Sequence, residues 1–375
     1  MPGPIHTKTI LAVIVLAGAT LRFFLISVHD LNTDEISRWK VAGQSMATIL
    51  REPFEGDAPE PNPPLFTLLL HFASDKERSA ARTRMVSSIA SLLAVIPIYF
   101  AGKKLFDPLT GLLSAFFLTF SPWFTHYSLE AKQYTLTALC GLLVFMAFLK
   151  CGEEMSRRNM AGYFFSAQAL LWTHYTGLFL LGTFFMLYLI RPNRETGSWL
   201  TLHGFIALAY GPFLLAIFKI LTAGSTRIDW IDPFSFDEIP RLFLIHFLGL
   251  DYIKKDPASA IYYFRMGSLW AFRIATTVLI LNVFTTAFRV FKKNGAQLAT
   301  LPDFITFVYL AGPLLCFIGF SLLIRPIYQA EYQVLIYPAF VILLARSVML
   351  VESRNMRWPY LVFTAGLWGW SFNQY

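Results

Sequence analysis

Long apolar stretches recur along almost the whole chain, and short polar or basic segments separate them. Each stretch runs for roughly 16 to 25 residues, the length that an α-helix needs to cross the hydrocarbon core of a bilayer. None shows the alternation of period two that is typical of strands, so we expect helices. The pattern predicts an all-α, polytopic membrane protein with about eleven transmembrane helices. The predicted spans are 9–28, 82–102, 109–123, 131–150, 160–173, 176–191, 199–222, 267–291, 303–323, 331–350 and 357–373.

The composition agrees with a membrane protein, because 56% of the 375 residues are hydrophobic and only 14% are charged. The formal net charge of +8 has two interpretations, a nucleic-acid surface or the Lys and Arg of cytoplasmic loops. These cations gather in short connections on one side of the predicted topology, so we favour the second interpretation and expect no nucleic-acid partner. The same asymmetry predicts a multi-pass protein of the inner (plasma) membrane, with a cytoplasmic N-terminus.

In this topology, residues 1–375 form one transmembrane domain, and the two long connections, 29–81 and 223–266, lie outside. Within the first, "ISRWKVAGQSMATIL" has apolar residues at helical spacing, and "PPLFTLLLHFA" begins with prolines and is too short to span. We expect both to form helices on the membrane surface. The acidic and proline-rich stretch between them is a connector or a mobile lid.

Ionisable residues gather at the predicted outer ends of the spans. The first span is followed by two adjacent acids, Asp34 and Glu35, and a later outer turn carries His126, Glu130 and Lys132. Each such residue has an ordinary explanation as an interfacial anchor or a helix cap. Their convergence on one face favours a functional site there.

The order of several motifs resembles a known family. "TDE", "NPPLFTLLLHF", "SPWFTHYSLEAKQY", "WTHYTG" and "IRPIYQAEYQVLIYP" follow one another as in the bacterial relatives of the protein O-mannosyltransferases. These are GT-C membrane glycosyltransferases, and their kin include the lipid A aminoarabinose transferase and the rhizobial core glycosyltransferases. Residues 9–191 carry most of the resemblance and 324–345 carry a weaker part of it.

The resemblance implies transfer of a sugar from a polyprenyl-phosphate carrier to a lipid-linked saccharide, a glycan or a protein at the outer face. Such a transfer needs a base for the acceptor hydroxyl and cations for the departing phosphate. By resemblance, Asp34 is the base, and Glu35 orients it or the acceptor. Because adjacent carboxylates repel, we also expect a raised pKa for one of them.

Several other residues match the substrate-binding motifs of the family. Glu130, Lys132 and Tyr134 stand in "EAKQY", where relatives commonly have "EARxY", so that the charge is kept but the bidentate guanidinium is lost. His174 matches a "THY" element, for which we expect a hydrogen-bonding role, and Arg325 is a second candidate cation for the phosphate.

Two departures from the family pattern suggest a different donor head group or a weakened site. Asn62 stands where His or Lys is usual, and Glu331 stands where an Arg usually precedes the Tyr. No metal-binding spacing accompanies the histidines, so we expect no metal and no cofactor.

Two other functions remain open on the sequence alone. A transporter or flippase would use Asp34, Glu130 and His174 to move protons or a head group, but it predicts ionisable residues near mid-span. A non-catalytic subunit of envelope-polysaccharide assembly would explain the substitutions at positions 62 and 331. The expected partners of the transferase are the polyprenyl-phosphate-linked sugar, membrane lipid and a lipid-linked or glycan acceptor.

Overall fold

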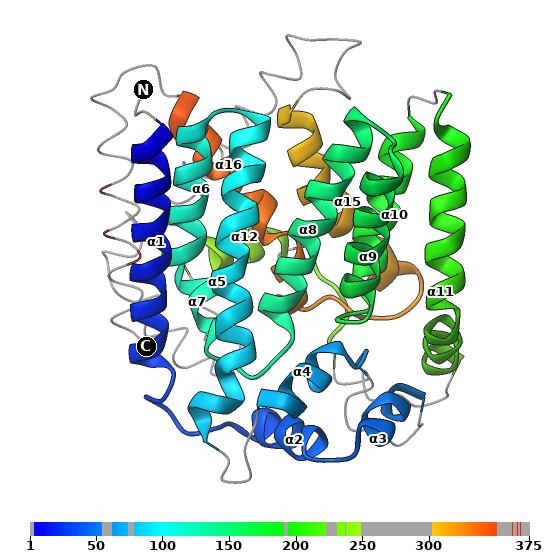
Figure 1. The fold of residues 1–375 in the computed structure, drawn as a ribbon. Coiled ribbons are helices and arrows are strands. Elements are labelled where there is room, and N and C mark those ends of the chain that lie inside the picture. Colours follow the sequence, from blue (N-terminus) through cyan, green and yellow to red (C-terminus); the bar gives the residue numbers. More distant parts are fainter. Residues whose placement is uncertain are drawn as a thin grey trace.

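The protein is a bundle of long helices standing side by side on a layer of short helices (Figure 1). The computed structural model describes residues 4–54, 62–73, 79–190, 194–222, 231–236, 238–248 and 302–350, together with Val362, Gly366 and Trp368. No strand occurs in these parts of the chain. The expected all-α class is therefore confirmed.

Nine helices of the bundle match predicted spans. Within the described residues, five helices are long and apolar enough to cross a membrane, and α6, α10 and α16 are shorter apolar helices. The predicted spans 267–291 and 357–373 and most of the segment 223–266 lie outside the described residues, so the total of eleven stays a prediction. The nine helices are α1 (Pro4–Leu25), α5 (Ala80–Leu105), α6 (Pro108–Phe120), α8 (Tyr134–Glu153), α9 (Arg157–Leu171), α10 (Gly177–Leu189), α11 (Thr196–Thr222), α15 (Pro302–Leu323) and α16 (Tyr337–Leu350).

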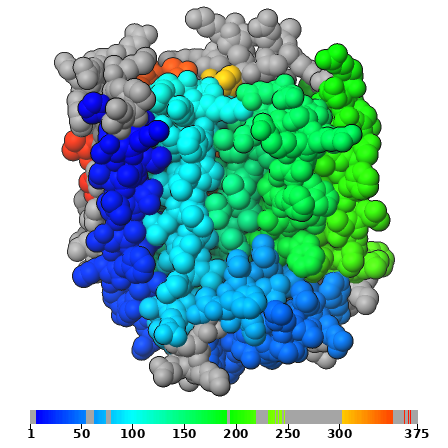
Figure 2. All heavy atoms as spheres, viewed as in Figure 1, coloured from blue at the N-terminus to red at the C-terminus, as the bar shows by residue number. Residues whose placement is uncertain are grey.

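The first long connection forms the layer at one end of the bundle. It contains α2 (Thr33–Ala42), α3 (Met46–Arg51), the 3₁₀ turn η1 (Glu52–Phe54) and α4 (Leu65–Ala73). Figure 2 shows them as a continuous blue surface below the bundle. The expected surface helices are thus present, although the stretch predicted as one helix forms two. The helix breaks because Gly43 caps the C-terminal end of α2 and Ser45 caps the start of α3, where its side chain accepts a hydrogen bond from the Thr48 N–H at 3.2 Å.

Two predicted spans have a break near the same end. The span 109–123 stops at Phe120, because Ser121 is extended and caps a separate short helix, α7 (Pro122–Ser128). Pro122 occupies the first turn of α7, a position where its missing N–H costs nothing. The span 331–350 likewise opens with a 3₁₀ turn, η4 (Glu331–Leu335), before α16. Both breaks leave irregular backbone within the predicted spans.

Close backbone contacts and buried polar groups hold the helices together inside the bundle. At the crossing of α5 and α6, a Cβ on Gly111 would lie 2.5 Å from the carbonyl oxygen of Tyr99, so only glycine fits there. Arg22 of α1 is 1% exposed, and it donates to Ser91 Oγ of α5 at 2.6 Å and to the Thr119 carbonyl of α6 at 3.2 Å. A polar group inside an apolar bundle needs such partners, so Arg22 fixes α1 against its neighbours.

Candidate active site

The two adjacent acids occupy the first turn of α2 but have different surroundings. Asn32 caps the helix by accepting the Glu35 N–H at 2.9 Å, while Glu35 Oε2 accepts the Asn32 N–H at 2.9 Å. This reciprocal pair is a capping box. Glu35 is fully buried, whereas the side chain of Asp34 is 66% exposed. One acid therefore serves the fold while its neighbour faces solvent.

Arg84 of α5 holds the buried carboxylate. Its Nε and Nη2 donate to the two oxygens of Glu35 at 2.7 and 2.8 Å, in a bidentate geometry. The same guanidinium donates to the carbonyls of Ile26, His29 and Asp30 at 3.0, 2.8 and 2.9 Å. Arg84 thus ties the end of α1 and the start of α2 to the bundle.

The pKa of Glu35 lies below its ordinary value. Burial by itself disfavours the charged form, but the hydrogen bonds from Arg84 and from the backbone N–H groups of Asn32 and Ala131, with the charge of Arg84, outweigh it. The expectation of a raised pKa within the acid pair is therefore wrong for Glu35, because it treated the neighbouring charge as the dominant influence.

The turn between α7 and α8 is fixed to the same carboxylate. The Ala131 N–H donates to Glu35 Oε1 at 2.9 Å, and Ser87 Oγ of α5 donates to the Lys132 carbonyl at 2.9 Å. As a result, Lys132 Nζ lies 3.3 Å from Asp34 Oδ2. The structure brings together the two residues that were expected to act as base and as phosphate-binding cation.

The Asp34–Lys132 pair has one buried and one accessible partner. The Lys132 side chain is only 9% exposed, so its position is constrained, whereas the Asp34 carboxylate opens to solvent. A single cation beside an accessible carboxylate can pair with that carboxylate or bind another anion in its place. An anionic ligand that reaches this site can therefore replace Asp34 as the partner of Lys132.

The other residues of this turn lie close to the pair. His126 Nε2 of α7 is 3.5 Å from Glu130 Oε1, and both side chains are about one quarter exposed, at 24% and 25%. Tyr134 is buried at the start of α8, with its ring centroid 4.8 Å from that of Tyr127. Glu130 and His126 are thus accessible polar groups, and Tyr134 is part of an aromatic cluster beneath them.

His174 occupies the turn between α9 and α10. Its Nδ1 accepts the Thr176 N–H at 3.3 Å and lies 2.7 Å from Thr176 Oγ1, which assigns the hydrogen of a neutral ring to Nε2. The ring centroid lies 5.1 Å from that of Tyr332 in η4. The Leu65 N–H of α4 donates to the Trp172 carbonyl of this turn at 2.9 Å, which joins the turn to the surface layer.

The remaining expected residues lie on other elements. Asn62 is half-buried directly before α4, and Arg325 is half-buried directly after α15. Glu331 opens η4, next to the residue that contacts His174. Across the described parts of the chain, no three His, Cys, Asp or Glu side chains converge as they would around a metal ion.

The sequence analysis missed Arg84 and its neighbours on α5. Arg84, Ser87, Ser88 and Ser91 are all buried and recur at the spacing of one helix face. A polar face at the start of an otherwise apolar span is a signal in the sequence, since such a helix must bury these groups against other polar groups. The buried pair Arg38–Glu52, at 4.0 Å between α2 and η1, was also missed.

Comparison with known proteins gives a partial family match. Residues 62–219 match the family model for dolichyl-phosphate-mannose-protein mannosyltransferase. The matched region contains Arg84, Lys132 and His174 but begins after the acid pair. No curated protein gives a significant match to the sequence.

Several solved structures share the fold of this chain. ArnT from Cupriavidus metallidurans in the apo state aligns with a TM-score of 0.57 at 14% identity, over 92% of this chain and 60% of ArnT. The same enzyme bound to undecaprenyl phosphate gives 0.58 at 14% identity, over 95% of this chain and 63% of ArnT. The archaeal oligosaccharyltransferase AglB from Archaeoglobus fulgidus, in complex with an inhibitory peptide and a dolichol-phosphate, gives 0.55 at 12% identity, over 97% of this chain and 54% of AglB.

These likenesses confirm the expected GT-C fold and the resemblance that predicted it. The chain spans less than two thirds of the length of these enzymes.

Proposed function

We propose that the protein is a glycosyltransferase that moves a sugar from a polyprenyl-phosphate carrier to an acceptor hydroxyl. The observation that carries this proposal is the accessible carboxylate of Asp34, held 3.3 Å from the constrained ammonium group of Lys132. The proposal is also supported by the shared fold with ArnT, which has been solved with undecaprenyl phosphate, and with AglB, which has been solved with a dolichol-phosphate.

In the proposed reaction, the acceptor oxygen attacks the anomeric carbon as the bond from that carbon to the phosphate oxygen breaks. Asp34 takes the proton of the acceptor hydroxyl, and the polyprenyl phosphate leaves with the electron pair of the broken bond. Asp34 then releases the proton to solvent, to which it is exposed. No redox step and no further reactant are required.

Lys132 is proposed to neutralise the phosphate. Without donor it pairs with Asp34. When a donor phosphate arrives, the ammonium group turns to it, and Asp34 becomes available to the acceptor hydroxyl. The departing phosphate gains negative charge, so this interaction strengthens toward the transition state.

Glu35 is proposed as a positioning residue rather than a catalytic one. It has no exposed surface, and its oxygens accept from Arg84, Asn32 and Ala131. Its ligands come from α2, α5 and the α7–α8 turn, so it sets the separation between Asp34 and Lys132. Around this pair we propose that the donor head group contacts Glu130, Tyr134, His174, Arg325 and Asn62.

We further propose that the site lies at the outer face of the inner membrane, with the N-terminus in the cytoplasm. Lys104 of α5 and Glu153 of α8 pair at 2.7 Å at the opposite end of the bundle from α2–α4 (Figure 1). Basic residues near short connections favour the cytoplasmic side.

The test is transfer of labelled sugar in proteoliposomes from a panel of synthetic polyprenyl-phosphate sugars. Asp34→Asn preserves shape and removes the base, so we expect transfer to fall by about 10²- to 10⁴-fold. The control is Asp30→Asn, which alters an exposed carboxylate in the same connection and is expected to leave the rate unchanged. Equal rates in Asp34→Asn and wild type would remove Asp34 from the mechanism, and no transfer by wild type from any donor would refute the proposed function.

A further inference from the structure

Hydroxyl groups of α5 hold the turn between α7 and α8, which carries Lys132. At the start of the turn, Ser88 Oγ donates a hydrogen bond to the Ser128 carbonyl at 2.7 Å. Further along, Ser87 Oγ donates to the Lys132 carbonyl at 2.9 Å. The first turn of α8 returns a bond to α5, because Thr135 Oγ1 donates to the Ser87 carbonyl at 2.8 Å. The turn is therefore attached to α5 at both of its ends.

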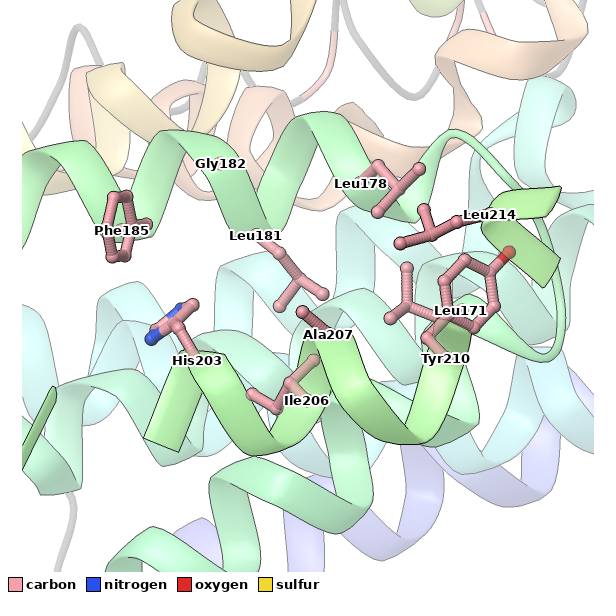
Figure 3. A pocket seen from close by; sticks show the side chains of 10 residues that line it. All are labelled: Leu171, Leu178, Leu181, Gly182, Phe185, His203, Ile206, Ala207, Tyr210 and Leu214. Carbon is pink, nitrogen blue, oxygen red and sulfur yellow. The ribbon is translucent and has the colours of Figure 1, made fainter. Parts of the chain in front are cut away.

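This polar contact differs from a contact between helices elsewhere in the bundle. Leu178 and Leu181 of α10 and Ile206 of α11 belong to the mainly apolar side chains that line the space between those two helices (Figure 3). On α5, by contrast, Ser87 is fully buried and Ser88 is 5% exposed. A buried hydroxyl and a backbone carbonyl in a turn each need a hydrogen-bond partner, so every bond between them satisfies two groups.

The same face of α5 is also held from the side of α1. Arg22 Nε donates to Ser91 Oγ at 2.6 Å, and Ser91 Oγ donates to the Ser88 carbonyl at 2.7 Å. All three of these residues are buried. The helix face that holds the turn is thus itself constrained, so it can serve as a fixed support.

The two serines differ from Glu35 in what they hold. Glu35 bonds to α2 and to the turn, so a change there would disturb Asp34 as well as Lys132. The hydroxyl groups of Ser87 and Ser88 donate to main-chain carbonyls at the two ends of the turn. They fix the backbone that carries Lys132, while rotation about its side-chain bonds can still turn the ammonium group from Asp34 to a phosphate.

We propose that Ser87 and Ser88 are positioning residues that hold the α7–α8 turn so that the Lys132 ammonium group meets the phosphate of the donor. The assignment rests on the proposed function, in which Lys132 neutralises that phosphate. A long side chain on a loosely held turn would reach the phosphate in few of its conformations, and correct placement of a catalytic group can supply a large part of the rate.

The first experiment measures the position of Lys132 without any turnover. The purified protein in nanodiscs is treated with sulfo-N-hydroxysuccinimide acetate, and acetylation of each lysine is followed by mass spectrometry. The Lys132 side chain is only 9% exposed. Loss of one bond from the turn should raise its acetylation rate roughly two- to tenfold in Ser87→Ala and in Ser88→Ala. Lys104, at the opposite end of the bundle, is the internal reference and should not change.

The second experiment measures sugar transfer at matched amounts of folded protein. Ser87→Ala should lower kcat by about 10- to 10²-fold, because the ammonium group is misplaced. In the Lys132→Met background the same change should alter kcat by less than about twofold, since no cation remains to be placed. A purely structural role for Ser87 would lower kcat in both backgrounds.

The matched control for both experiments is Ser114→Ala. Ser114 is a buried serine of α6 whose hydroxyl donates to the Thr110 carbonyl of its own helix at 2.8 Å. Its replacement should change neither the acetylation of Lys132 nor kcat.

Unchanged acetylation of Lys132 in both serine variants would overturn the proposal. Equal loss of kcat from Ser87→Ala in the wild-type and Lys132→Met backgrounds would also overturn it, and so would full activity of Ser87→Ala despite faster acetylation. If wild type transfers no sugar while both serine variants expose Lys132, the proposed function is refuted, but the hold of the two serines on Lys132 is supported.

Discussion

Replacing Arg84 by methionine should destabilise the protein more than other single changes near the site. The variant loses two hydrogen bonds to the Glu35 carboxylate and three to backbone carbonyls. Glu35 would remain fully buried, with only the N–H groups of Asn32 and Ala131 as partners. Removing one partner of a buried ion pair costs about 3 to 5 kcal/mol, because the other charge is left uncompensated. We expect the free energy of unfolding to fall by that amount.

The assay is equilibrium unfolding in mixed micelles with increasing SDS, and Arg82→Met is the control, because Arg82 is exposed on the same helix. A double-mutant cycle with Glu35→Gln separates the pair from its surroundings. If the carboxylate is what Arg84 stabilises, the double variant should be more stable than the sum of the single changes predicts, by roughly 0.5 to 3 kcal/mol. A loss below about 1 kcal/mol for Arg84→Met, or strict additivity in the cycle, would refute the reasoning.

Three further predictions follow from the same structure. Because the pKa of Glu35 is lowered on folding, its contribution to stability should be complete above its ordinary pKa of about 4.3 and should disappear as the pH falls through the folded pKa. In thermal unfolding between pH 3 and 7, the stability of wild type should therefore approach that of Glu35→Gln only at the acid end. Lys132→Met should lower kcat/KM for sugar transfer by about 10²- to 10³-fold, whereas Lys132→Arg should keep most of the wild-type kcat/KM. Equal activity of the two variants would argue against a phosphate-binding cation at this position. Gly111→Ala should cost about 1 to 3 kcal/mol in SDS unfolding, because its Cβ would press on the Tyr99 carbonyl, while Gly152→Ala, where a Cβ meets no atom within 4 Å, should cost nothing.

Most of the bundle could be predicted from the sequence, because each span must be an apolar helix long enough to cross the hydrocarbon core. Nine predicted spans coincide with helices to within several residues. The breaks at Ser121 and at η4 were missed because the predicted bounds followed hydropathy alone, although Ser121 and Pro122, and the polar Glu331 and Gln333, mark these positions in the sequence. Length and hydropathy describe how much chain can cross a membrane, but they do not report where a serine or proline ends a helix inside it.

The candidate site could be predicted only in part. Local motifs marked Asp34 and Lys132 separately, and the structure brings them together. The role of Glu35 was less predictable, since two adjacent acids look equivalent in a sequence. What distinguishes them is contact with Arg84 and Ala131, which lie 49 and 96 residues further along the chain. Such contacts depend on tertiary packing, which helical spacing and composition do not predict.

The long sequence separation of these contacts also has a consequence for how the protein is made. During synthesis and insertion, α2 emerges well before Arg84 and long before Ala131. Until α5 is in place, Glu35 has only its cap at Asn32, and Asp34 has no lysine beside it. The chain therefore carries its acid pair through the early stages of biogenesis in an unassembled form. The site is completed only when the α7–α8 turn docks, so its maturation reports on correct insertion of the first four long helices.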